Sequence, residues 1–450
     1  MKEFEHFLES IAGWIWNYPL LILLMGGGVF FMIYSRFLPF RFFGHAINVI
    51  RGKYDNESDP GQINHFQALS GALAATIGMG NISGVAIAIS VGGPGALFWM
   101  WVSAFFGIAT KFFTCTLAVL YRGKDSSGEI QGGPMYFIME GLGQKWKPLA
   151  VAFSIFGLLG ATPLFQANQI VEAFSDIVLV SDSENESYRF YLELGLGFIL
   201  MILTGAVIFG GIKRIGLVAS RLVPSMVFLY ILGVFYILFK HSDQLASSFA
   251  MIFTDAFSAK ASMGGALGAL IITGVRRAAF SNEAGIGTAP MMHGAAKTTQ
   301  PVREGLVAML GPAIDTLVIC TLTGLAILVT GVWSESSLSG VSLTTEAFKS
   351  IPVIGPYILA ICIFIFGFTT IFGLAYYGKK CFGFLFGADK AHYFDYWYVG
   401  LVILGSISTL KGVIAFVDMG YGLMAFPTMI SAILLAPKVM EAARKYFDSI

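Results

Sequence analysis

Charged residues and cysteines are scarce in this sequence. Asp, Glu, Lys and Arg make up only 12% of its 450 residues, against about 25% in an ordinary soluble domain. The four cysteines have no paired spacing, so neither a disulfide framework nor a metal site is indicated. The net charge of +1 says nothing about nucleic acid, but the lack of a basic, aromatic-interleaved stretch gives no sign of nucleic acid as a partner. We also expect no cleavable signal peptide, because no basic region and small-residue cleavage site open the chain.

Apolar residues, in contrast, are abundant: they form 56% of the chain, and the mean hydropathy is +0.75. A membrane-spanning helix needs about 20 mostly apolar residues. The sequence therefore predicts an all-α, multi-pass protein of the cell membrane, with the lipid bilayer as its surroundings. Its long apolar runs predict about 11 spans, at residues 14–35, 65–90, 96–121, 149–173, 191–211, 222–239, 263–283, 305–330, 356–377, 396–416 and 420–437.

Basic residues cluster in the loops that follow every second predicted span. These residues are Arg36, Arg41, Arg51, Lys53, Arg122, Lys124, Lys145, Lys147, Lys213, Arg214, Arg221, Lys297, Arg303, Lys379 and Lys380. Because cytoplasmic loops carry an excess of Lys and Arg, we expect the N-terminus outside and the C-terminus in the cytoplasm. Residues 241–262 are too polar to span the membrane and too apolar for a free loop, so we expect an external interfacial segment there.

The second predicted span contains an unusual interruption, TIGMGNISG at residues 76–84. Glycines in a membrane helix often serve only close packing. Here Gly78, Gly80 and Gly84 surround Asn81, and unwound backbone at that depth is tolerated only where it is buried or lines a wet cavity. The sequence therefore predicts a broken helix.

A second interruption is predicted at Thr273 and Gly274, within the seventh span. With the first span set aside, the remaining ten form two sets of five, each opening with a broken helix. An odd number of spans per set inverts the second set, which is the 5+5 inverted-repeat plan of many secondary transporters. The predicted organisation is an N-terminal helix with a cytoplasmic loop (1–60), a first repeat (61–240), the external segment (241–262) and a second repeat (263–450).

Such breaks have a chemical use, because half-helix N-termini attract anions and freed carbonyls take up cations. Met79, Gly80 and Asn81 are predicted to hold a substrate carboxylate, and the carbonyls of Ala74 and Ile77 to face sodium. Thr76, Thr273 and Gly274 complete the substrate-binding residues predicted at the two breaks.

Four stretches carry a resemblance to a known family: GALAATIGMGNISGVAIAI (71–89), GEIQGGPMYFIMEGLG (128–143), FSNEAGIGTAPMMHGAA (280–296) and GPAIDTLVICTLTGLAIL (311–328). Together they resemble the alanine or glycine:cation symporter family. The resemblance implies a leucine-transporter-type inverted-repeat fold with one extra N-terminal helix. It also implies uptake of a small neutral amino acid, alanine or glycine, coupled to co-transported sodium.

The same resemblance implies roles for individual residues. Asn81 matches the family's asparagine in the first broken helix, while Gln166 and Thr370 would contact substrate. Thr369 and Thr370 would complete a sodium site with the carbonyls at the first break. Leu374 stands where the family often has tryptophan, which leaves the size of the substrate open.

Other polar residues inside the predicted spans leave alternatives open. Lys111 and Asp315 are interpreted either as a buried packing pair or as residues for coupling or gating. Arg276 and Arg277 are placed toward the cytoplasm, one as an anchor and the other as a candidate partner of Asp315 or Glu283. His293 is predicted to be interfacial, and Asn168 to bond a neighbouring helix.

Four other functions compete with sodium-coupled uptake. A carrier of another small zwitterionic solute stays open, and so does a proton-coupled amino-acid transporter, although the predicted ion site holds only hydroxyls and carbonyls. A channel is disfavoured because no filter-like ring of carbonyls is visible. No catalytic motif points to an enzyme.

Overall fold

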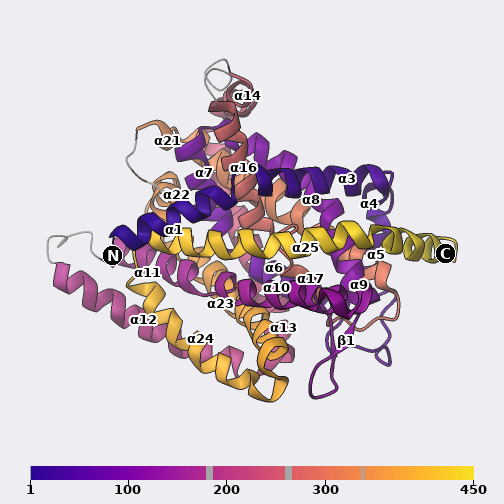
Figure 1. The fold of residues 1–450 in the computed structure, drawn as a ribbon. Coiled ribbons are helices and arrows are strands. Elements are labelled where there is room, and N and C mark those ends of the chain that lie inside the picture. The colour runs from indigo at the N-terminus through magenta and orange to yellow at the C-terminus, as the bar shows by residue number, and fades with distance from the viewer. Residues whose placement is uncertain (1, 179–185, 259–265, 336–337, 339, 450) are drawn as a thin grey trace.

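A computed structural model describes residues 2–178, 186–258, 266–335, 338 and 340–449 (Figure 1). Helices make up nearly all of this part of the chain, as predicted. The one sheet among the described residues is a small antiparallel hairpin of β1 (Gly123–Lys124) and β2 (Ile130–Gln131). Helix α25 (Leu410–Phe447) runs along the length of the molecule to the C-terminus (Figure 1).

Seven single helices or helix runs are long and apolar enough to cross a membrane, and two bent pairs bring the number of candidate spans in the described residues to nine. The bent pairs are residues 6–34, with a bend of 40°, and residues 65–92, with a bend of 52°. Helices α16 (Ala266–Asn282) and α24 (Ala391–Ser406), with 17 and 16 residues, lie at the two remaining predicted positions.

The N-terminal part and the first predicted repeat account for the chain up to residue 240. Their helices are α1 (Lys2–Ile15), α2 (Tyr18–Leu21), η1 (Ile22–Gly26), α3 (Gly27–Tyr34), α4 (Leu38–Arg41), α5 (Phe43–Ile50), α6 (His65–Thr76), η2 (Gly80–Gly84), α7 (Val85–Gly92), α8 (Gly95–Leu120), α9 (Pro134–Leu142), η3 (Gln144–Trp146), α10 (Lys147–Gly160), α11 (Leu164–Val178), α12 (Glu186–Ile208) and α13 (Gly211–Lys240). The N-terminal helices pack along the outside of the repeats, α1 against α25 and α3 against α8.

The rest of the chain begins with α14 (Ser242–Ala256), a helix where the interfacial segment was predicted. It packs against α8, and the Asp255 carboxylate accepts a hydrogen bond from the Gly95 N–H at 2.8 Å. The helices of the second predicted repeat, besides α16, α24 and α25, are α17 (Ala289–His293), α18 (Pro301–Ala308), α19 (Leu310–Pro312), η4 (Ala313–Cys320), α20 (Thr321–Val329), α21 (Val332–Glu335), α22 (Val341–Phe348), α23 (Gly355–Phe386) and η5 (Ala388–Lys390).

A helix is present at the predicted span 396–416, but the predicted bounds are wrong, because the chain turns inside that range. Helix α24 ends at Ser406 and α25 begins at Leu410. The hydroxyls of Ser406 and Ser408 donate to the carbonyls of Val402 and Leu404 at 2.9 and 2.5 Å. These short hydroxyl side chains suit a helix end and turn, whereas apolar content alone does not mark one.

The second break is also displaced from its predicted position. Helix α16 continues through Thr273 and Gly274, and Gly274 serves packing: a Cβ there would lie 2.6 Å from the Trp99 Cβ of α8. The chain unwinds after Asn282 instead, where Glu283, Gly285 and Gly287 have φ of 54°, 86° and 106°. Glycine adopts such positive φ values without strain, so FSNEAGIG and not ITG is the true interruption.

The basic loops lie together at one end of the bundle. Arg122 donates to the carbonyls of Pro60, Gly294, Ala296 and Thr298, which joins the loops after the first, third and seventh predicted spans. The Ala388 N–H donates to the Ser126 hydroxyl at 2.8 Å, which adds the ninth. Near the C-terminus the Tyr446 hydroxyl contacts His45 and accepts from Arg303.

Candidate transport site

The break in the first repeat is fully buried and is organised by the side chain of Asn81. Helix α6 ends at Thr76, and Ile77 is extended, with ψ of 91°. The Asn81 Oδ1 accepts from the Gly78 N–H at 2.8 Å, and its Nδ2 donates to the Asp315 carboxylate at 2.7 Å. Asn81 thus satisfies an orphan amide of the break and ties it to η4 of the second repeat.

Three other predicted residues of the first break lie around Asn81. The Thr76 hydroxyl donates to the Ala72 carbonyl at 3.1 Å, so it bonds its own helix. Met79 is fully buried at the start of η2. A Cβ on Gly80 would lie 3.2 Å from the Cα of Ser281, so this glycine permits close contact between η2 and α16.

Thr370 joins the first break to α23. Its hydroxyl donates to the Ala74 carbonyl at 3.1 Å and to the Phe366 carbonyl at 2.9 Å. A Cβ on Gly78 would lie 3.1 Å from the Thr370 Cβ, so only a glycine allows this approach. The structure therefore brings Thr370, Ala74 and Gly78 together, next to Ile77 in the chain.

Thr369 points elsewhere. Its hydroxyl donates to the Phe366 carbonyl at 3.0 Å and contacts the Met226 sulfur of α13 at 3.6 Å. In this conformation the two neighbouring threonines of α23 face different helices, and Thr370 is the one in contact with the first break.

Gln166 presents an unsatisfied polar atom. Its side chain is 4% exposed, and its Oε1 has no hydrogen-bond partner among the described residues. A buried amide oxygen without a partner is costly, so this atom is suited to receive a donor from a ligand. Gln166 lies on α11, which packs against α23.

The structure places Thr273 and Gly274 apart from the second break. The methyl group of Thr273 lies near Gly92 of α7, and Gly274 lies against Trp99 and Ala96 of α8.

A buried carboxylate cluster next to Asn81 was only partly foreseen. Besides Asn81, the Asp315 carboxylate accepts from the hydroxyls of Ser281 at 2.8 Å and Thr316 at 2.7 Å. Asp315 is fully buried, and η4 is a π-helix. An intramembrane aspartate was itself the signal, but its partners come from three separate segments. Such a set of oxygen atoms has the chemistry to hold a cation or a proton.

The hypothesis that one of Arg276 and Arg277 pairs with Glu283 or Asp315 is wrong. Both guanidinium groups bind the carboxylate of Asp418 on α25, each at 2.5 Å. Glu283 instead accepts from the hydroxyls of Thr288 and Tyr421.

The arginine pair lies close to the first break. The guanidinium of Arg277 stacks 5.2 Å from the ring centroid of Phe280. A Cβ on Gly80 would in turn lie 3.4 Å from that ring. Phe280 also packs against Phe165 and Tyr421, with centroids 5.1 and 5.6 Å apart. A charged and aromatic cluster thus covers one side of the break.

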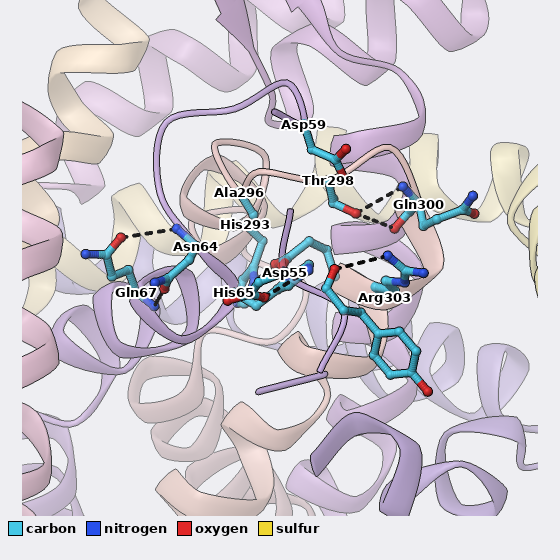
Figure 2. Close-up of polar contacts among 12 residues, drawn as sticks. Asp55, Asp59, Asn64, His65, Gln67, His293, Ala296, Thr298, Gln300 and Arg303 are labelled. Atoms are coloured by element: carbon cyan, nitrogen blue, oxygen red, sulfur yellow. Dashed lines mark hydrogen bonds and ion pairs between the residues drawn. The ribbon is translucent and has the colours of Figure 1, made fainter. Parts of the chain in front are cut away.

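Two histidines and a glutamate form a second cluster, beside the loops at the other end of α6. The fully buried Glu304 carboxylate contacts Nδ1 of His65 through one oxygen and Nδ1 of His293 through the other, the latter at 2.6 Å. Figure 2 shows His65, His293 and Asp55 converging below the loop that carries Asp59. His293 is fully buried, so its predicted interfacial position is wrong. The cluster joins the first residue of α6 to the last of α17.

Lys111 is buried in α8, where a Cβ on Gly311 of α19 would lie 3.3 Å from its Nζ. No ion pair joins it to Asp315 in the described structure. Asn168 was predicted to bond a neighbouring helix; it donates instead to the Ser408 carbonyl, in the turn between α24 and α25, at 2.7 Å.

Comparisons with known proteins agree with this architecture. The chain is similar to the sodium/alanine symporter AgcS of Methanococcus maripaludis, with 38% identity over 99% of this chain and 97% of that protein. It is 35% identical to the probable sodium/glutamine symporter GlnT of Bacillus subtilis, over 98% and 90% of the two chains. Among solved structures, MhsT in complex with L-phenylalanine shares the fold, with a TM-score of 0.59, 16% identity, and coverage of 85% of this chain and 98% of that chain.

The fold is therefore that of the leucine-transporter type, and the chain is a multi-pass membrane transport protein and not an enzyme. The model of the sodium:alanine symporter family matches residues 1–450, and the chain therefore belongs to that family.

Proposed function

We propose that this protein imports a small neutral amino acid, alanine or glycine, together with sodium by alternating access. The observation that carries the proposal is the contact between Thr370 of α23 and the Ala74 carbonyl at the end of α6. It places hydroxyl and carbonyl oxygens, the ligands that hard cations prefer, directly beside a broken helix. Family membership and the symporters among the relatives support the choice of sodium and alanine.

The substrate lies at the first break in this proposal. Its carboxylate binds the N–H groups of Met79, Gly80 and Asn81, because the start of a half-helix carries positive partial charge. The Asn81 N–H now donates to the Gly78 carbonyl at 3.1 Å, so it binds the carboxylate only once that bond opens. The unpartnered Gln166 Oε1 accepts from the substrate's ammonium group. The Thr76 and Thr370 hydroxyls bound the site, and Thr273 and Gly274 contact substrate only if α16 moves relative to α8.

Sodium occupies the neighbouring position, bound by the carbonyls of Ala74 and Ile77 and the hydroxyls of Thr369 and Thr370. For Thr369 this requires a change of side-chain rotamer, since its hydroxyl now faces Met226. Bound sodium ties α6 to α23 in one conformation. If sodium and the amino acid both bind this conformation more tightly than others, their binding is coupled. Each ligand then raises the affinity of the protein for the other.

Two narrower alternatives have specific support. GlnT is a probable glutamine symporter by its name, and Leu374 leaves the substrate's size open, so another small zwitterionic solute is the first. Proton coupling is the second, because the Asp315 carboxylate bonds Asn81 directly and supplies the titratable group that the predicted ion site lacked.

We further propose that the N-terminus is outside and the C-terminus cytoplasmic. We also propose the division of the chain into an N-terminal part (1–60), a first repeat (61–240), an external segment (241–262) and a second repeat (263–450). The gathering of the basic loops at one end of the bundle supports this orientation.

Uptake by the purified protein in proteoliposomes tests the proposal. Labelled alanine should accumulate under an inward sodium gradient and not when potassium replaces sodium. Asn81→Ala should abolish accumulation, whereas Asn56→Ala, in an exposed loop, should leave it unchanged. Accumulation driven by a pH gradient without sodium, and lost in Asp315→Asn, would favour proton coupling. Uptake of glutamine but not alanine would overturn the substrate assignment.

A further inference from the structure

A cavity of about 220 Å³ opens at the end of the bundle where the basic loops gather. Its walls come from segments that are distant in the sequence: Gln62 precedes α6, Gln131 lies in the hairpin, and Tyr376 and Lys380 lie on α23. The volume is below the roughly 300–1,000 Å³ of pockets for drug-sized ligands. It therefore suits a small solute.

Two side chains that line this cavity carry buried polar atoms without hydrogen-bond partners among the described residues. They are Lys380, whose Nζ lies 5.0 Å from the centroid of the Tyr376 ring, and Gln131, whose Oε1 is unpaired. Their neighbours are already satisfied. Lys379 pairs with Asp395 at 2.5 Å, and the Gln131 Nε2 donates to Asp125 at 2.7 Å. What remains is the Lys380 amine, which is a cationic donor when protonated, and one neutral acceptor. They match the carboxylate and the ammonium group of a zwitterion.

The cavity and the proposed transport site lie at different heights along the same helix, α23. Thr370 and Lys380 are ten residues apart on α23, about 15 Å along a helix. Gln62 lies just before the first residue of α6, whose other end is the first break. Helix α23 therefore borders both sites, and the segment just before α6 reaches the cavity. The Tyr376 hydroxyl donates to the Met291 carbonyl of α17 at 3.5 Å.

We propose that this cavity is a second amino-acid site, which receives the substrate after it leaves the first break and before it enters the cytoplasm. Lys380 binds the carboxylate, and Gln131 accepts from the ammonium group. Binding here is independent of sodium, because Lys380 supplies the positive charge. This inference rests on the proposed function, since it takes the same substrate and the same orientation.

Exchange across proteoliposomes of known orientation tests the site. Lys380→Met keeps the apolar stem and removes the charge, and Lys390→Met removes an exposed lysine of the nearby η5. Losing a charge-assisted hydrogen bond should raise the half-saturating alanine concentration on the cytoplasmic face about tenfold. The external half-saturation for alanine and for sodium should not change, nor should any value in Lys390→Met.

Direct binding gives an independent readout. In sodium-free buffer, the Asn81→Ala protein should still bind labelled alanine weakly, and adding Lys380→Met or Gln131→Leu should remove that binding. Propionate and ethylamine, which each offer one charged group, should compete poorly. Competition by inorganic phosphate at lower concentrations than alanine would make this an anion site and overturn the proposal.

The two proposals fail separately. If the unaltered protein takes up no amino acid under any ion gradient, the proposed function is wrong. If uptake is sodium-driven but Lys380→Met and Gln131→Leu both match Lys390→Met on the cytoplasmic face, the second site alone is wrong.

Discussion

At the scale of single residues, the structure of the first break depends on the side-chain amide of Asn81 and on the missing side chain of Gly78. Asn81 bonds the backbone of the break with one end of its amide and Asp315 with the other. Gly78 leaves the space that the Thr370 side chain fills. Because the contacts with Asp315 and Thr370 cross between elements, single substitutions here should change ligand affinity more than they change folding.

The two threonines of α23 give the first residue-scale prediction. Thr370→Val removes the hydroxyl that contacts the Ala74 carbonyl, so the sodium concentration for half-maximal uptake should rise about tenfold. Thr369→Val should have a smaller effect, because its hydroxyl faces Met226. Sodium titrations of alanine uptake measure both. A larger effect of Thr369→Val would contradict the contacts described.

The substitution Gly78→Ala gives the second prediction at the residue scale. The added methyl would overlap the Thr370 side chain, and overpacking of this kind costs about 1–3 kcal/mol. Sodium and alanine affinity should both fall, because the methyl separates α6 from α23. Gly400→Ala is the matched control, since nothing lies within 4 Å of a Cβ there. Equal transport by the two variants would count against close approach at Gly78.

At the scale of elements, each repeat opens with a break, and separate clusters hold the helices around the breaks. Arg276 and Arg277 fasten α16 to α25 through Asp418, and the Trp16 indole donates to the Asp418 carbonyl at 2.8 Å. Glu304 joins α6 to α17. These links lie on either side of the proposed site, so they are placed to restrain the motion of both broken helices.

Asp418→Asn tests the first of these links. It leaves two guanidinium groups without a counter-charge, and removing one partner from a buried ion pair costs about 3–5 kcal/mol. The midpoint of thermal unfolding in detergent should fall well below that of Asp389→Asn, an exposed control. Adding Arg276→Gln to Asp418→Asn should recover part of the loss, because one unpaired charge is removed. No recovery would mean that Asp418 acts through packing and not through charge.

At the scale of the whole molecule, the positions of the loops argue for one orientation. The Arg122 guanidinium binds carbonyls from two other loops, and the hairpin beside it meets η5 through Ser126 and Ala388. Helix α14 packs on the first residues of α8, whereas Arg122 follows its last residue. The two segments therefore belong to opposite faces of the membrane.

Cysteine labelling tests this orientation. The four native cysteines are buried, so single exposed cysteines can be placed at Ser127 beside the hairpin and at Ser247 on α14. A membrane-impermeant maleimide applied to intact cells should label Ser247→Cys and leave Ser127→Cys unlabelled until the cells are opened. The reverse pattern would place the N-terminus in the cytoplasm.

The sequence by itself determined the membrane class, the helical fold, the first break and the residues around it. Apolar content follows directly from the lipid surroundings, and a dense set of glycines with one asparagine is a local signal. Apolar content and glycines were misleading signals, however, for the bounds of one span and for the position of the second break. The run at 396–416 hides a turn, and Gly274 proved to be a packing glycine of a continuous helix.

The tertiary structure alone decided which polar groups meet. Asp418 pairs with arginines 141 and 142 positions away, and Asp315 meets Asn81 across 234 positions. The cavity at the end of the bundle where the basic loops gather likewise combines residues of the hairpin with residues of α23. A buried charge takes whichever partner the folded helices place within hydrogen-bonding distance, and neither spacing nor composition encodes that distance.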